Sequence, residues 1–279
     1  MSRAELADDM KPTDRDSARA VSSKSRLSWS DLRGLAFLAF LVLVWEVWQR
    51  LPGESSALTT SFVDVFQTGF RLAMTGELER DYAASLIRVL IGFALGASSG
   101  LLLGALLGIS GWADSILGPI FNTLRQVPIF GLIPLISIWF GTAELGKLVL
   151  ITLAAFYPVL LHAHEGLRDA PRSYHDVATV FMFSRVQVLR RLRLPCALPT
   201  ILTGVRHAVA FAWISGVGSE IFMPSNVGLG SLLATGRIQL RMDYIWLAII
   251  IVGATGYAMN RGLGALERRL LRWRPAFVS

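Results

Sequence analysis

The stretch "IGFALGASSGLLLGALLG", residues 91–108, decides the fold because it carries a glycine at every fourth position of an otherwise apolar run. Glycine costs about 1 kcal/mol relative to alanine in the interior of a helix in water. No Asp, Glu, Lys or Arg occurs from Val89 to Ala113. A helix of that length crosses the roughly 30 Å hydrocarbon layer and satisfies its own backbone there. The sequence therefore predicts an integral membrane protein.

The regular glycines indicate that this helix packs closely. Lipid tails are as apolar as leucine, so membrane helices associate through small residues that let their backbones approach. Each step of four residues drifts by about 40° around a helix, so five such residues cover nearly half of its circumference. The spacing predicts a central helix with more than one close neighbour, and a single tight pair is the alternative. The residues concerned are Gly92, Gly96, Gly100, Gly104 and Gly108.

Composition extends this prediction to the whole chain. Of the 279 residues, 53% are hydrophobic and only 17% are charged, which is too apolar for a soluble domain of this size. An all-α protein with about six transmembrane helices is expected, and Pro128 and Pro134 interrupt the third. The expected spans are residues 34–51, 89–113, 118–141, 148–161, 198–222 and 244–260. Residues 1–33 are expected to form a disordered tail and residues 267–279 a second tail.

The basic residues predict the orientation of the chain. Eighteen of its 27 Lys and Arg residues lie in residues 1–33, in the loop 165–199 and after residue 260. Cytoplasmic loops carry the excess of positive charge, so both termini and the loop 165–199 are expected in the cytoplasm. Residues 223–243 are then expected outside. This bias also explains the pI of 10.2, so the charge does not indicate nucleic-acid binding.

Signals for catalysis are weak. The histidines of "LHAHEGL" are two residues apart, whereas a helical metal site needs a spacing of four, and no phosphate-binding loop motif occurs. No catalytic residue, metal site or cofactor is therefore predicted. Ionisable residues inside the spans usually face the bundle interior or a transport path, although those near span ends can also reach the interface. Four candidates for a path or gate are Arg88, Arg125, Arg206 and Glu220, of which Arg206 lies deepest.

The loop before the fifth span has a pattern of its own. Asp176 to Val188 reads as a short amphipathic helix, followed by a run of arginines. Pro195 and Pro199 are expected to stop this helix before the next span. A short helix at this place either lies flat on lipid or docks into a soluble partner.

This segment resembles the EAA loop of the permease subunits of bacterial ATP-binding-cassette importers. The family pattern is E-A-A-x-x-x-G, followed after nine residues by I-x-L-P. Asp replaces the family Glu, and methionine stands where the family has its glycine, which favours a continuous helix or a groove that accepts a larger side chain. The positions that match by spacing are Asp176, Val177, Ala178, Met182, Leu192, Leu194 and Pro195.

Further resemblance covers residues 82–266. It includes "SLIRVLIGFALG" from Ser85, "QVPIFGLIPLISIWFG" from Gln126 and "SEIFMPSNVGLGSLL" from Ser219. These stretches are similar to the branch that imports nitrate, sulfonates, taurine and related small anions. The resemblance implies a permease without its own ATPase activity, in which the seven loop residues dock onto an ATPase subunit.

The implied partners are two ATPase subunits, a second and identical permease chain, a periplasmic or lipid-anchored substrate-binding protein and membrane lipid. The implied location is the bacterial inner membrane. ATP binding closes the ATPase dimer and moves the docked helices, which switches the path between its inward- and outward-facing states. Two other classes stay open at this point, namely a membrane-embedded enzyme and an anchoring subunit without transport.

Overall fold

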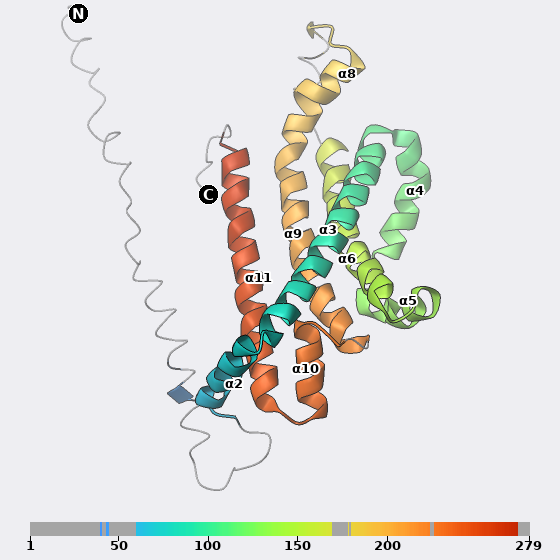
Figure 1. Ribbon diagram of the computed structural model, residues 1–279. Coiled ribbons are helices and arrows are strands. Elements are labelled where there is room, and N and C mark those ends of the chain that lie inside the picture. Colours follow the sequence, from blue (N-terminus) through green and yellow to red (C-terminus); the bar gives the residue numbers. More distant parts are fainter. Residues whose placement is uncertain are drawn as a thin grey trace, which may run out of the picture. The chain divides into compact units, whose positions relative to one another are not determined.

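The computed structural model describes residues 40, 43, 44, 60–168, 178, 180–223 and 226–272. The chain divides into two units, Met1–Glu54 and Ser55–Ser279, and only three described residues belong to the first. The predicted N-terminal tail and most of the first predicted span therefore lie outside the described residues. Within the second unit every regular element that the structure describes is helical, which confirms the all-α prediction (Figure 1).

The second unit begins with two helices that meet at a tight turn, α2 (Phe62–Met74) and α3 (Glu77–Ile109). The pair α4 (Gly111–Leu124) and α5 (Ile133–Phe140) follows, separated by a short 3-10 turn, η1 (Ile129–Leu132). Next come α6 (Glu144–Arg168), α8 (Arg185–Val188), the π-helical segment η2 (Leu189–Arg193) and α9 (Leu194–Phe222). The last two helices are α10 (Leu229–Ile238) and α11 (Met242–Leu270).

Four stretches of helix are long and apolar enough to cross a membrane: α3, α6, the run Arg185–Phe222 that contains α9, and α11. The bent pair formed by α4 and the residues 129–140, whose two parts meet at 89°, is a fifth candidate if it is counted as one broken span rather than as a re-entrant loop. The sequence predicted a broken third span, and the break follows α4 directly before Pro128. The count of six stays a prediction because residues 34–51 lie largely outside the described part.

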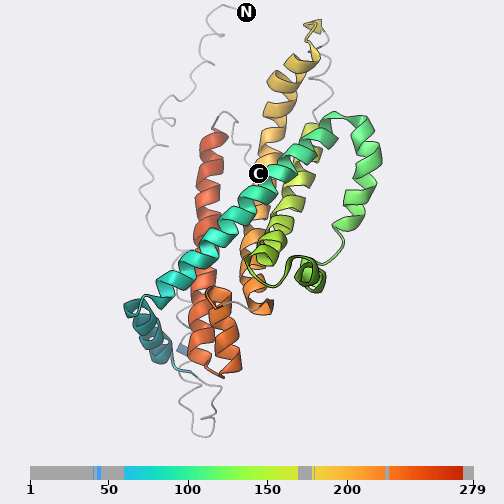
Figure 2. The same cartoon turned by 45° about the vertical axis from the view of Figure 1, so that its right-hand side comes forward.

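All five glycines of α3 face the same neighbour, α6. A Cβ atom on Gly96, Gly100 or Gly104 would lie 2.3–2.5 Å from a backbone carbonyl oxygen of α6. The nearest atoms around Gly92 and Gly108 also belong to α6. The prediction of a helix with more than one close neighbour is confirmed, because α3 also packs against α9, but the five glycines all contact α6. The physical reason is that rows of residues four apart wind around a helix, and α6 crosses α3 obliquely along that row (Figure 2).

Helix α6 lies between α3 and α9, and together these three helices form the centre of the unit. Its buried residues include Ile151, Ala155 and Val159, which pack with Ala208 and Trp213 of α9. Glycine also brings α6 and α9 together, because a Cβ on Gly204 would lie 2.6 Å from the Cβ of His162.

The short helices α2 and α10 were not predicted from the sequence. They pack with the first turns of α11 around Val65, Leu72, Leu232, Leu247 and Ala248. Both lie at the end of the unit that is opposite α8 (Figure 1).

Candidate functional site

Two of the four predicted path residues, Arg88 on α3 and Glu220 on α9, bind each other in the interior. The Nη1 atom of Arg88 donates a hydrogen bond to Oε1 of Glu220. Its Nε and Nη2 atoms donate to the two carboxylate oxygens of Glu144 on α6, at 2.6 and 2.9 Å. Glu220 is only 1% exposed and Arg88 only 6%. The guanidinium is thus held by two carboxylates and joins three helices.

Glu220 also binds the start of α10. Its Oε2 atom accepts the backbone N–H of Gly230 at 2.8 Å, and the Ser85 hydroxyl lies 2.8 and 2.9 Å from its two oxygens. Ser85 in turn accepts the N–H of Leu229 at 2.9 Å, and Asp81 accepts that of Gly228 at 3.2 Å. The first N–H groups of a helix have no partner within the helix. Side chains of α3 and α9 supply those partners here.

Glycine is required where α10 approaches Glu220. Gly228 has a φ of 141°, and a Cβ there would lie 2.5 Å from the Glu220 carboxylate. A Cβ on Gly230 would lie 2.3 Å from the carbonyl oxygen of Val217. The G-x-G in "NVGLGSLL" was the signal for this contact, and sequence analysis did not use it.

Ser85, Glu144 and Lys147 were not predicted as site residues from the sequence. Lys147 is 1% exposed within α6, and its Nζ donates to Glu144 at 3.3 Å. We call this group the buried polar cluster. It comprises Ser85, Arg88, Glu144, Lys147, Glu220 and the backbone N–H groups of residues 228–230.

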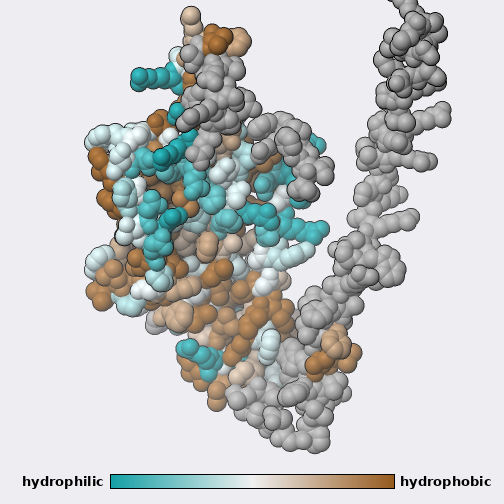
Figure 3. Space-filling view, turned by 180° about the vertical axis from the view of Figure 1, so that it is seen from behind, coloured by the Kyte–Doolittle hydropathy of each residue, from teal (hydrophilic) through white to brown (hydrophobic). Residues whose placement is uncertain are grey.

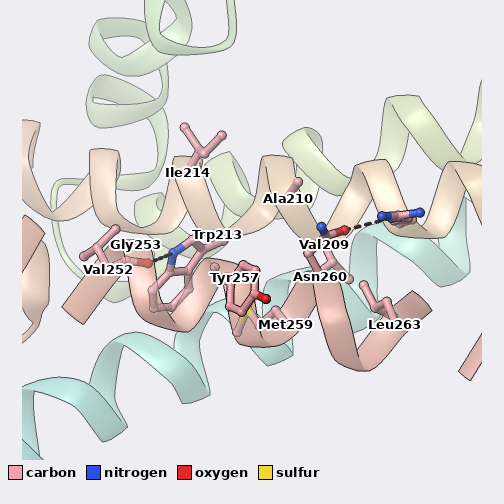
Figure 4. A pocket seen from close by; sticks show the side chains of 12 residues that line it. Val209, Ala210, Trp213, Ile214, Val252, Gly253, Tyr257, Met259, Asn260 and Leu263 are labelled. Carbon is pink, nitrogen blue, oxygen red and sulfur yellow. Dashed lines mark hydrogen bonds between the residues drawn. The ribbon is translucent and has the colours of Figure 1, made fainter. Parts of the chain in front are cut away.

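Arg206 lies away from this cluster, on the face of α9 that meets α11. Its Nε donates to Oδ1 of Asn260 at 2.8 Å, and its Nη1 lies 3.8 Å from Glu267. It is about half exposed and lines a largely apolar groove of about 330 Å³ between the two helices, whose other lining residues include those labelled in Figure 4. The indole N–H of Trp213 crosses this groove to the carbonyl of Val252, at 3.1 Å.

Arg125 takes a third position. It follows the last residue of α4, and its side chain is exposed. Within the described residues it forms no side-chain hydrogen bond or ion pair. It lines a narrow cleft between α4 and α6, together with Asn122, Tyr157 and His164 among others. The structure therefore brings Arg88 and Glu220 together and leaves Arg125 and Arg206 apart from them and from each other.

The predicted docking loop bends at Met182. Asp176 and Val177 lie outside the described residues, whereas Ala178 and Val180 are helical. Met182 has a φ of 51°, and the N–H of Phe183 donates to the carbonyl of Ala178 at 2.9 Å. This is the longer hydrogen bond of a Schellman cap, in which a left-handed residue ends the helix. The predicted continuous helix over 176–188 is therefore wrong, since methionine adopts the backbone conformation expected of the family's glycine.

Exposure divides the docking loop into two groups. Ala178 and Leu192 are buried against this same chain, Ala178 to 3%. Three consecutive apolar side chains are exposed instead, namely Val180 at 78%, Phe181 at 68% and Met182 at 91%. We call these three the apolar tip. Seen from behind, hydrophilic residues gather in the half of the molecule that carries this tip, whereas apolar residues dominate the other half (Figure 3).

After the bend the helix continues without interruption. Ser184 and Gln187 form a capping box that starts α8, and the helix then runs from Arg185 to Phe222. The prediction that Pro195 and Pro199 stop it is wrong. In η2 the N–H of Leu194 donates five residues back, to Leu189, and this wider turn accommodates the proline at 195, which has no N–H to donate. We call Arg185–Phe222 the long rod.

Comparisons with known proteins agree with this architecture. The family model described as "Binding-protein-dependent transport system inner membrane component" matches residues 100–272. The chain is 32% identical over 277 residues to the "Putative aliphatic sulfonates transport permease protein SsuC" of Bacillus subtilis strain 168, covering 99% of each chain. It is 30% identical over 246 residues to the "Bicarbonate transport system permease protein CmpB" of Synechococcus elongatus, covering 85% of this chain and 88% of that protein.

Among solved structures, the fold resembles a chain of the MetNI methionine ABC transporter in an inward-facing conformation. The TM-score is 0.59 at 19% identity, and the match covers 71% of this chain and 97% of that chain. At this identity the likeness concerns the fold alone.

Proposed function

We propose that this chain carries a small anion across the inner membrane. It belongs to the family of binding-protein-dependent transport system inner membrane components. Members of this family are multi-pass permease subunits of ABC importers, in which ATP is hydrolysed by a separate subunit. Membership therefore implies an ATPase partner, a substrate-binding partner and a second permease chain. It also decides against the membrane-embedded enzyme and the anchoring subunit.

The proposed solute is a small oxyanion. The relatives described above carry names that refer to aliphatic sulfonates and to bicarbonate, both of which are anions with a compact, oxygen-bearing charged group. We propose that the second permease chain is a copy of this one. A periplasmic or lipid-anchored binding protein would then deliver the solute to the outer end, where α10 and α2 lie.

The observation that carries the docking proposal is the apolar tip. Val180, Phe181 and Met182 project from the end of the molecule where hydrophilic residues gather, so they are not placed to face lipid tails. Contiguous exposed apolar side chains in such surroundings mark an interaction site. We propose that the tip docks onto the ATPase subunit and that the buried residues Ala178 and Leu192 hold it in position.

A charge on the tip tests this proposal. Phe181→Asp would bury an unpaired carboxylate on docking, which costs several kcal/mol. The variant is expected to reach the membrane at normal abundance, lose the ATPase on purification and show background uptake of a labelled sulfonate into proteoliposomes. Arg190→Ala, which replaces an exposed arginine on η2, should keep both the bound ATPase and the uptake. Ala178→Asp is a poorer probe, because Ala178 is buried within this chain and the change would also disturb the loop itself. Normal uptake by Phe181→Asp would contradict the docking proposal.

The proposed orientation places both termini and the apolar tip in the cytoplasm. In a Cys196→Ser background, Asn226→Cys beside α10 is expected to react with an impermeant maleimide added outside intact cells. Gln187→Cys on α8 is expected to react only after the membrane is opened. Both positions are exposed, so a difference in labelling reports sidedness rather than burial. Reaction of Gln187→Cys from outside would reverse the orientation.

A further inference from the structure

Arg125 lies deep along the bundle. Asp114, in the first turn of α4, pairs with Arg168 at the last turn of α6, 2.7 Å away, and this pair marks the end of the unit that carries α8. Arg125 follows eleven residues later, which is about 16 Å further along the helix axis. In a hydrocarbon layer of roughly 30 Å this depth is near the middle. Figure 1 shows the same placement, since α4 ends part-way along the bundle and α5 turns aside there.

The backbone is also broken at this depth. The two parts of the broken span meet at 89°, and Arg125, Gln126 and Val127 are exposed between them. Lipid cannot satisfy the carbonyl groups at the end of α4 or a guanidinium near the bilayer centre. Irregular backbone at such a depth occurs only where it is covered by protein or lines a water-filled cavity. The break therefore faces water or another chain.

Arg125 differs from the other two embedded arginines in the partners of its guanidinium. The guanidinium of Arg88 is held by Glu144 and Glu220, and that of Arg206 binds Asn260 close to Glu267. No acidic residue in the described part of the chain forms an ion pair with Arg125. Its exposed side chain lines, with Asn122 and Tyr157, a mostly apolar cleft between α4 and α6 of about 20 Å³, which has room for about one water molecule. These groups offer several hydrogen-bond donors and one uncompensated positive charge.

We propose that Arg125, with Asn122 and Tyr157, binds the transported anion half-way across the membrane. The inference rests on the proposed function and adds the residues that contact the solute. A planar guanidinium offers two parallel N–H donors to a sulfonate or carboxylate, a pairing that is stronger than a neutral hydrogen bond.

Water access to Arg125 can be measured without knowing the solute. In a Cys196→Ser background, Arg125→Cys in inside-out vesicles should react with the anionic reagent sulfonatoethyl methanethiosulfonate at least tenfold faster than Ile120→Cys. Ile120 is a matched control because it is exposed on another side of the same helix. Equal rates, or no reaction at Arg125→Cys while Gln187→Cys reacts, would overturn the proposal and point to a contact with the second permease chain.

Uptake assays test the role of the positive charge on Arg125. Arg125→Gln in the assembled transporter should retain the ATPase subunit and ATP hydrolysis but reduce the uptake of labelled methanesulfonate and bicarbonate at least tenfold. Arg125→Lys should restore part of that uptake, and Arg190→Gln, which replaces an exposed arginine of η2, should leave it largely unchanged. Unchanged uptake by Arg125→Gln would overturn the anion site. If the unmodified transporter took up no solute with ATP, the proposed function would fail instead, and cysteine labelling would still report whether Arg125 faces water.

Discussion

Replacing Glu220 with alanine is expected to abolish stable assembly of the permease. The change removes the acceptor for the Gly230 N–H and for Ser85, and it leaves Arg88 with its buried Nη1 unpaired. Breaking a buried ion pair by removing one partner typically costs about 3–5 kcal/mol. A polytopic membrane protein has little stability to spare. The thermal stability of the detergent-solubilised protein and its abundance in the membrane measure the effect.

Two further variants separate charge from packing at this site. Glu144→Ala should also destabilise the protein, because it leaves the buried Nζ of Lys147 and two N–H groups of Arg88 without their carboxylate, although Arg88 retains Glu220. The double change Arg88→Leu with Glu220→Leu should be less destabilising than Glu220→Ala, since replacing both partners leaves no unpaired charge. If Glu220→Ala were as stable as the unmodified protein, the buried pairing of Glu220 would contribute nothing to the fold.

The second large effect is expected at Gly100. Its missing Cβ would lie 2.5 Å from the carbonyl oxygen of Phe156, and a backbone atom in the middle of α6 cannot move aside. Gly100→Leu must therefore separate α3 from α6 and lose the van der Waals packing that holds membrane helices together. We expect the variant to be degraded or to aggregate, as measured by size-exclusion chromatography after solubilisation.

The control for this variant is the same substitution at a glycine with open surroundings. Gly262 on α11 has no neighbouring atom within 4 Å of its Cβ position, so Gly262→Leu should be tolerated. Leu102→Ala, on the exposed side of α3, should also be mild because it removes bulk that contacts lipid. Equal damage from Gly100→Leu and Gly262→Leu would mean that the α3–α6 contact is not as close as described.

The sequence predicted where the apolar helices of the described part lie, because a span depends on the local run of apolar residues. It did not predict their limits, since α3 begins at Glu77 rather than at residue 89 and α11 ends at Leu270 rather than at residue 260. It also predicted the break before Pro128, since proline acts on the backbone next to it. It could not show that all five glycines of α3 meet one helix. That result depends on the angle at which α6 crosses, which no local pattern contains.

The candidate site was likewise predicted only where it depends on local sequence. Arg88 and Glu220 were singled out as embedded charges, but their pairing joins residues 132 positions apart in the chain. The bend at Met182 was missed because propensity disfavours a left-handed methionine, by roughly 1–2 kcal/mol. The cap at Phe183 and the capping box at Ser184 outweigh that cost.

The long rod connects the apolar tip to the opposite end of the unit. It has 38 residues, which correspond to about 57 Å at 1.5 Å per residue. It begins three residues after the apolar tip, and its last turns carry Glu220, which binds the start of α10. Because one continuous helix joins these two ends, we expect a displacement of the tip to be transmitted to the start of α10.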